Sequence, residues 1–255
     1  MNKIVAVFNQ KGGVGKTTTT LNLTTALSLK GYRILTVDID PQGNAGSGFG
    51  LDKEDMTQSV YDALIGQVNP KDIILTTGYD NLHILPSNVD LAGSEVELAS
   101  VPDREKKLKR CLDQVKGYYD YIFIDCPPSL GLLTINALTA ADTVLIPIQC
   151  EFYALEGVSQ LMSTIDLVRH SLNPELEIEG VLLTMFDSRT NLSGEVMQEV
   201  REYFKDKVYH TMIPRNVRLA EAPSFGKTIF DYSFNSKGSK AYQEFADEFE
   251  KRQEN

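Results

Sequence analysis

The sequence has few of the residues that build disulfide frameworks and metal clusters. Among its 255 residues are three cysteines, Cys111, Cys126 and Cys150, and three histidines. The cysteines lie far apart and form no C-x-x-C pair, so the sequence indicates neither a disulfide framework nor a zinc or iron-sulfur site. This sparse usage fits a reducing cytosol, and we expect a cytoplasmic protein.

Long apolar runs and an excess of positive charge are also missing. The first apolar run, residues 4–8, is too short for a signal sequence, and no segment approaches the length needed to span a membrane. Lys and Arg number 25 against 35 Asp and Glu, which gives a net charge of −10. This balance argues against a protein that coats nucleic acid, so any contact with DNA requires a local basic patch.

Short β-branched runs alternate along the chain with helical patterns. Nearly continuous apolar runs predict strands at residues 4–8, 34–39, 82–86, 121–125, 143–148, 180–186 and 208–213. One helical repeat between them contains Leu155, Val158, Met162, Ile165, Val168 and Leu172. The alternation predicts an α/β fold with a doubly wound, mainly parallel sheet. Since no Gly-, Pro- or Ser-rich linker interrupts it, we expect residues 1–255 to form a single domain.

The segment QKGGVGKT, residues 10–17, nearly matches the phosphate-loop pattern G-x-x-x-x-G-K-[ST]. Gln10 replaces the first glycine of that pattern, and an additional lysine, Lys11, follows it. The segment comes directly after the strand predicted at 4–8 and opens a helix predicted at 17–30, which is the context that a phosphate site requires. The sequence therefore predicts a nucleotide-binding loop of unusual form.

Each residue type in this loop suits phosphate binding. Gly12, Gly13 and Gly15 let successive backbone N–H groups point inward at the helix N-terminus. Lys16 is expected to reach the β and γ phosphates, and the hydroxyl of Thr17 to ligate Mg²⁺.

Two further strands carry carboxylates to the same edge of the predicted sheet. Asp125 ends the strand at 121–125 and is the candidate that would hold Mg²⁺, through water. Asp38 and Asp40 lie on one face of an extended segment at the end of the strand at 34–39. Asp40, at the loop edge, is the better candidate for orienting a water molecule.

Four segments together resemble the ParA/Soj chromosome or plasmid partitioning ATPases, which carry a deviant Walker A loop. They are KGGVGKT at 11–17, DIDPQGN at 38–44, IDCPPSLG at 124–131 and IPRNVRLAEAPS at 213–224. The resemblance covers nearly the whole chain and implies a P-loop NTPase with weak intrinsic ATPase activity. Because a strand is predicted close to the first residue, we expect no separate helix-turn-helix domain.

The resemblance also implies roles for individual residues in an ATP-bound sandwich homodimer. Lys11 is expected to reach the partner's phosphates, Gly12 to lie at the dimer seam, and Asp40 to position the attacking water. Pro214 and Asn216 resemble the segment that contacts adenine. The residues expected to bind ATP or ADP are Lys11, Gly12, Gly13, Val14, Gly15, Lys16, Thr17, Thr18, Pro214 and Asn216, and those expected in catalysis are Lys11, Lys16 and Asp40.

The C-terminal part carries the local excess of positive charge. Residues 189–240 contain nine Lys or Arg against six Asp or Glu. The resemblance implies that Arg189 and Arg218 bind double-stranded DNA without sequence preference, that the protein associates with the nucleoid, and that a ParB-type protein stimulates hydrolysis. Some relatives also regulate replication initiation, so a replication initiator is a further partner that the resemblance implies.

Two alternatives share the loop. One is a MinD-like, membrane-cycling regulator of the division site, which would need a basic amphipathic C-terminal helix. Residues 241–250 are instead acidic, with Tyr242, Phe245, Ala246 and Phe249 on one face, so we expect this helix to pack on the domain. The other is a reductase-type iron protein, but Cys126 and Cys150 are expected to be small core residues.

Overall fold

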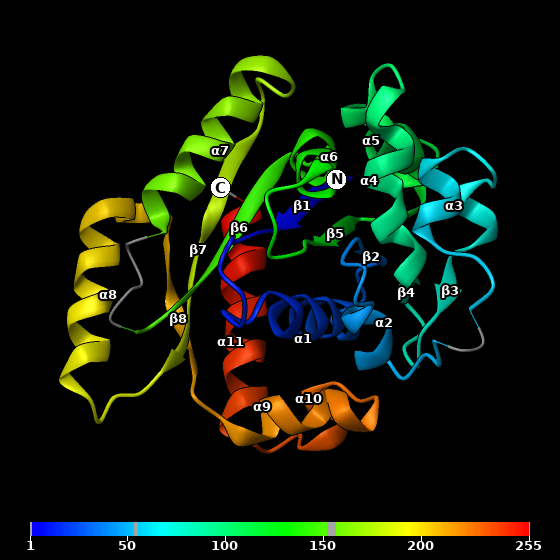
Figure 1. The fold of residues 1–255 in the computed structure, drawn as a ribbon. Helices are drawn as coiled ribbons and strands as arrows, with labels where there is room; N and C mark the ends of the chain where they lie inside the picture. The colour runs from blue at the N-terminus through cyan, green and yellow to red at the C-terminus, as the bar shows by residue number, and fades with distance from the viewer. Residues whose placement is uncertain (1, 54–55, 152–156, 255) are drawn as a thin grey trace.

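A twisted, eight-stranded sheet forms the centre of the protein (Figure 1). The computed structural model describes residues 2–53, 56–151 and 157–254. The strands are β1 (Lys3–Val7), β2 (Ile34–Asp38), β3 (Leu75–Thr76), β4 (Leu82–Leu85), β5 (Tyr121–Asp125), β6 (Thr143–Gln149), β7 (Glu177–Phe186) and β8 (Val208–Pro214). Their order is β3-β4-β2-β5-β1-β6-β7-β8, and the pairings are parallel except that between β3 and β4.

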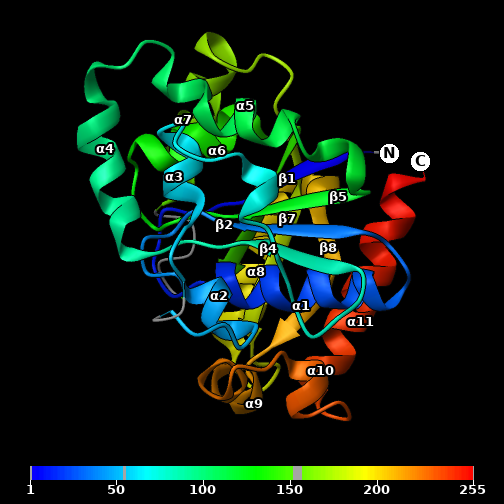
Figure 2. The same ribbon diagram turned by 90° about the vertical axis from the view of Figure 1, so that its right-hand side faces the viewer.

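Helices cover both faces of this sheet. They are α1 (Lys16–Leu29), α2 (Asn44–Gly48), α3 (Val60–Leu64), α4 (Ser94–Glu97), α5 (Lys107–Asp113), α6 (Leu132–Ala140), α7 (Val158–Ser171), α8 (Asn191–Phe204), α9 (Val217–Glu221), α10 (Ile229–Tyr232) and α11 (Lys237–Gln253). Figure 2 shows α5 and α6 on the opposite side of the sheet from α1. The two largest apolar cores lie one on each side of the sheet.

Alternation along the strands divides the side chains between these cores. In β1, Ile4 and Ala6 face the core that contains α6, whereas Val5 and Val7 face the core that contains α1. This arrangement confirms the predicted α/β fold with a doubly wound, mainly parallel sheet, in which strands buried on both faces are apolar throughout.

The predicted strands are confirmed, and one strand was missed. The strand β3 has two residues, Leu75 and Thr76, pairs antiparallel with β4, and is exposed at the sheet edge. A pair of exposed residues shows no periodicity, so the sequence gives no signal for it. The helical repeat that was predicted around Val158 forms α7, and Leu155 lies outside the described residues.

The last helix, α11, packs on the core through the predicted face. Tyr242, Phe245, Ala246 and Phe249 are buried, and the ring of Phe245 meets that of Tyr209 edge to face at 4.7 Å. The face that a membrane anchor would need is therefore occupied by the domain itself. Among the described helices, none is both long and apolar enough to cross a bilayer.

The strand order places β1 between β5 and β6, with connections leaving in opposite directions. Ligands of doubly wound sheets bind beyond the carboxyl ends of strands at such a reversal point. The loop after β1 and the ends of β2 and β5 meet at this edge, because Asp38 and Asp125 are register partners and Val7 pairs with Asp125.

Candidate nucleotide-binding site

The loop between β1 and α1 has the backbone that its glycines predict. Gly13 and Gly15 adopt φ values of 75° and 91°, a left-handed region that favours glycine. Gly15 is the N-cap of α1. The hydroxyl of Thr184 in β7 donates a 2.8 Å hydrogen bond to the Val14 carbonyl, which fixes the loop against the sheet.

The residue that breaks the usual pattern has a structural contact of its own. The side-chain amide of Gln10 donates to the hydroxyl of Thr164 in α7 at 2.9 Å, so it ties the start of the loop to a helix across the sheet edge. Lys11 follows with its backbone N–H bonded to the Asn9 side chain at 3.0 Å. Its ammonium group forms an ion pair with Glu151, and the Lys11 side chain is 44% exposed.

Lys16 is buried beside the carboxylates. Its Nζ donates a 3.0 Å hydrogen bond to the Lys11 carbonyl, which holds the ammonium over the loop. Burial lowers the pKa of Lys16, while the charges of Asp125 and Asp40 oppose that shift. A cation in such a water-poor place interacts more strongly with phosphate than an exposed one does.

Asp125 ends β5 and is completely buried. Burial raises the pKa of its carboxyl group, and the nearby Thr17 and Thr20 hydroxyls and the charge of Lys16 counteract this. Thr20 Oγ1 lies 3.2 Å from Asp125 Oδ1, whereas no described residue forms a hydrogen bond with Oδ2. An unpaired buried carboxylate oxygen is costly, and a hydrated cation would satisfy it. The residues present therefore fit Mg²⁺, which proteins commonly hold through few side chains, waters and phosphates.

The two aspartates after β2 differ in what they do. Asp38 is buried and accepts hydrogen bonds from the backbone N–H groups of Asp40 (3.1 Å), Ala45 (2.9 Å) and Gly46 (3.3 Å). Its carboxylate therefore shapes the loop that carries Asp40. Asp40 lies just within the protein surface, and its Oδ1 accepts the Gln42 N–H at 2.9 Å, which leaves Oδ2 for another partner.

Of the remaining residues predicted to contact nucleotide, Gly12 and Thr18 lie in the loop and in α1, whereas Pro214 and Asn216 lie at the end of β8 and just after it, three strands from β1 in the sheet order. No atom of the described chain lies within 4 Å of a Cβ built on Gly12. The Thr18 carbonyl accepts a 2.7 Å bond from the Asn22 amide. Pro214 ends β8, and Asn216 caps α9 by accepting the Arg218 N–H at 2.8 Å.

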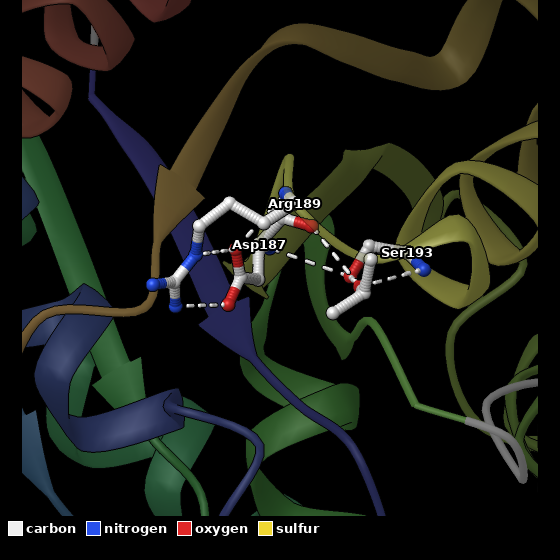
Figure 3. A network of polar contacts seen from close by, with 4 residues as sticks. Asp187, Arg189 and Ser193 are labelled. Atoms are coloured by element: carbon white, nitrogen blue, oxygen red, sulfur yellow. Dashed lines mark hydrogen bonds and ion pairs between the residues drawn. The ribbon is translucent and has the colours of Figure 1, made fainter.

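The two arginines predicted to bind DNA are exposed and paired with carboxylates of their own chain. Arg189 forms a two-pronged ion pair with Asp187, and Arg218 contacts Glu221 at 3.1 Å (Figure 3 shows the first pair). Their side chains are 86% and 58% exposed.

Sequence reasoning found the loop and the strand-end aspartates but missed their supports. These supports are Thr20 in α1, Thr164 in α7, Thr184 in β7 and Glu151, which lies two residues after β6, and no local pattern marks them. Cys126 and Cys150 are buried core residues, as predicted, and burial raises the pKa of the Cys150 thiol to about 12.

Comparisons with known proteins agree with this geometry. A family model, the AAA domain, matches residues 2–178. Sporulation initiation inhibitor protein Soj of Bacillus subtilis is 59% identical over 248 residues, which are 97% of this chain and 98% of that protein. This chain belongs to the ParA/Soj family of chromosome-partitioning ATPases. Chromosome partitioning protein ParA of Myxococcus xanthus is 52% identical over 252 residues, covering 99% of this ParA/Soj chain and 89% of that protein.

A solved structure shows a close match to this ParA/Soj chain in three dimensions. Cobyrinic acid a,c-diamide synthase from Mycobacterium smegmatis, with bound ADP and magnesium, is 42% identical with a TM-score of 0.85. The match covers 97% of this chain and 93% of that one. That related protein thus holds ADP and magnesium on the same fold.

Proposed function

We propose that this chain is an ATP-dependent DNA-segregation switch with weak intrinsic ATPase activity, built as one ATPase domain over residues 1–255. The observation that carries the proposal is that Lys16 and Asp125 are both buried beside the glycine loop, and that one oxygen of the Asp125 carboxylate has no hydrogen-bond partner among the described residues. A cation above a row of backbone N–H groups binds phosphate, and an unpaired carboxylate oxygen binds a hydrated metal ion. The family membership then favours chromosome partitioning as the process that the site serves.

Residues of this site would hold Mg²⁺ and ATP or ADP. Thr17 and Asp125 would hold the metal ion, and the loop from Lys11 to Thr18 would enclose the phosphates, with Pro214 and Asn216 beside the adenine. Bound Mg²⁺ supplies neutralisation of phosphate charge during hydrolysis. Asp40 would accept a hydrogen bond from the attacking water through the carboxylate oxygen that the Gln42 N–H does not occupy.

Lys11 is proposed to act on the phosphates of a second subunit in an ATP-bound sandwich dimer. Its side chain is 44% exposed, and its ammonium group forms a surface ion pair with Glu151, an interaction that contributes about 0–1 kcal/mol. Breaking the ion pair with Glu151 so that Lys11 can reach a buried phosphate therefore costs little free energy. The Lys11 ammonium group would then stabilise the charge of the transition state, as an arginine finger does. The open space beside Gly12 supports a close approach of another subunit there, since its own chain does not require glycine.

DNA binding is proposed to reside on the surface that carries Arg189 and Arg218. Both guanidinium groups are exposed, and a dimer doubles their number. Phosphate contacts of this kind release counterions and read no sequence. The proposed cycle is ATP-driven dimerisation, attachment to nucleoid DNA, and release when a ParB-type partner stimulates hydrolysis. The MinD-like alternative receives no support from α11, whose apolar face is buried.

The test is binding to a mixed-sequence DNA duplex with ATP, with ADP and without nucleotide, across a salt series. We expect the protein to bind DNA with ATP but not with ADP or without nucleotide, and we expect its affinity for DNA to fall steeply as the salt concentration rises. The Asp40→Ala variant should form an ATP dimer that remains on DNA, because water is no longer oriented for attack. Equal DNA affinity in all three nucleotide states would contradict the switch, and rapid ATP hydrolysis by Asp40→Ala would remove the role assigned to Asp40.

A further inference from the structure

Arg189 does not extend freely into solvent, although 86% of its side chain is exposed. It lies in the turn between β7 and α8, and its guanidinium is folded back on Asp187 (Figure 3). Arg189 Nε donates to Asp187 Oδ1 at 2.9 Å, and Nη2 donates to Oδ2 at 2.7 Å. Two parallel bonds between a guanidinium and a carboxylate form the strongest geometry of such pairs.

The turn itself holds the carboxylate in place. Asp187 Oδ1 also accepts the backbone N–H of Arg189 at 3.1 Å, and the Asp187 N–H donates to Ser193 Oγ at 3.3 Å. The Thr190 hydroxyl donates to the Asp187 carbonyl at 3.1 Å and lies 3.0 Å from Ser193 Oγ. Asp187 is 21% exposed, so the carboxylate is the fixed member of the pair and the arginine is the mobile one.

A carboxylate in this position imitates a DNA phosphate. Guanidinium binds carboxylate and phosphate oxygens through the same pair of N–H groups. Here Nε and Nη2 are already engaged, and a phosphate that approached them would also meet the negative charge of Asp187. We infer that Asp187 competes intramolecularly with DNA phosphate for Arg189 and so sets the affinity of the DNA-binding surface; this inference rests on the proposed function.

The second arginine has a looser version of the same contact. Arg218 Nη1 donates to Glu221 Oε2 at 3.1 Å, and the Tyr232 hydroxyl donates to the same oxygen at 3.0 Å. One N–H is engaged instead of two, and Tyr232 shares the acceptor. Glu221 is therefore a weaker competitor than Asp187.

The size of the effect follows from the exposure of the pair. Exposed ion pairs are weak, so releasing an arginine from one should change its contribution to DNA affinity by a factor of up to about five. Because a symmetric dimer presents the pair twice, we expect Asp187→Asn to tighten DNA binding by about threefold to tenfold at low salt. Glu221→Gln should tighten it by about twofold.

The experiment measures the dissociation constant of the full-length, ATP-bound protein for a mixed-sequence DNA duplex. Asp187→Asn keeps the Oδ1 acceptor for the Arg189 N–H, removes the charge and replaces Oδ2, the acceptor of the Nη2 bond, by an amide donor. Glu199→Gln on α8 is the matched control, because it removes one exposed negative charge that does not touch Arg189. Asp187→Asn and the control are each compared with and without Arg189→Ala.

We expect the gain from Asp187→Asn to exceed that from Glu199→Gln, to disappear in the Arg189→Ala background, and to shrink as salt rises. An equal gain from Glu199→Gln, or a gain that persists without Arg189, would overturn the inference in favour of a general charge effect. The Arg189→Ala variant alone tests the underlying function: if DNA affinity does not fall, the assignment of Arg189 fails, whatever Asp187→Asn does. Unchanged thermal unfolding of Asp187→Asn confirms that the turn is intact.

Discussion

The charged groups at the phosphate-loop edge and those on the surface around Arg189 and Arg218 are held in opposite ways. Lys16 and Asp125 are buried, and their partners come from the loop and from α1. Arg189 and Arg218 are 86% and 58% exposed, and their partners lie two and three residues away in the chain. The buried groups cannot relax without unfolding, whereas the exposed pairs can exchange partners with water or another molecule.

This difference determines where binding energy can come from. A buried lysine is already desolvated, so its attraction to phosphate is strong and local. An exposed arginine is screened by salt, and its contribution depends on how many such groups act together. We therefore expect single substitutions to have decisive effects at the buried edge and graded effects on the exposed surface.

The largest effect is expected from Lys16→Ala. Removing the buried ammonium should weaken ATP binding by at least about a thousandfold, because no other described cation is buried with Asp125 and the loop. Isothermal titration with Mg-ATP measures this. Lys11→Ala is the matched control from the same loop and should bind ATP as a monomer while losing hydrolysis and stable dimers. If Lys16→Ala lowered the ATP affinity by tenfold or less, burial of the ammonium group would add little to its attraction for phosphate.

The same contrast explains which features of the fold and the site could be predicted from the sequence. The loop, α1 and the ends of β2 and β5 were predictable, because glycines with positive φ and apolar strands that end in aspartate leave local patterns. Thr184 and Glu151 were not, since their contacts with Val14 and Lys11 join residues far apart in the chain. Nothing local fixes which distant side chain faces a loop.

Asp187 is an intermediate case. It lies two residues before Arg189, and an aspartate that opens a turn commonly bonds the N–H two residues on, so a local signal existed. The fold-back of the arginine was not predictable, because several rotamers of an exposed side chain have similar free energy. The charge count over residues 189–240 includes Arg189 but begins after Asp187, so it does not reveal their pairing.

A second large effect tests burial away from the nucleotide edge. Lys3 Nζ lies 2.6 Å from Glu179, whose side chain is 4% exposed. Lys3→Met should reduce the free energy of unfolding by about 3 kcal/mol, since it leaves a buried carboxylate without its cation. Chemical denaturation measures the loss, and Lys3→Met with Glu179→Gln should recover most of it. A loss of unfolding free energy below about 1 kcal/mol would show that the Lys3–Glu179 pair stabilises the protein no more than an exposed ion pair does.

The pH dependence of this pair gives the sign of the effect. Burial alone would raise the pKa of Glu179, but hydrogen bonds from Lys3, Thr143 and Gln253 outweigh it and lower that pKa. In the wild type the stabilising contribution of Glu179 is thus fully present above the ordinary glutamate pKa and is lost as pH falls from there through the lowered pKa of the folded state. Without Lys3 the pKa should be raised instead, so the penalty of Lys3→Met should grow as pH rises from about 4 to 8. A penalty independent of pH would exclude this electrostatic cause.

A smaller effect is expected when charge on the exposed surface is reversed. Arg189→Glu with Arg218→Glu should weaken DNA binding at least tenfold near 0.1 M salt while ATP-dependent dimerisation remains. A dimer would lose four phosphate contacts, so the slope of log K against log salt should become less negative by about 3.6. DNA binding and sedimentation with ATP measure both properties. Unchanged DNA affinity would move the DNA-binding surface elsewhere, and lost dimerisation would place these arginines at the subunit interface.

The smallest effect is expected from a neutral hydrogen bond that connects α11 to α1. The Tyr242 hydroxyl lies 3.1 Å from Thr19 Oγ1, and both side chains are buried. Tyr242→Phe should cost about 1 kcal/mol of the free energy of unfolding, the usual contribution of one such bond. The matched control is Tyr203→Phe on α8, where the ring is 51% exposed and the expected change is close to zero. Equal losses of unfolding free energy in both variants would mean that burial does not determine how much a hydrogen bond stabilises this protein. The contrast between the phosphate-loop edge and the surface around Arg189 and Arg218 would then have to rest on charge alone.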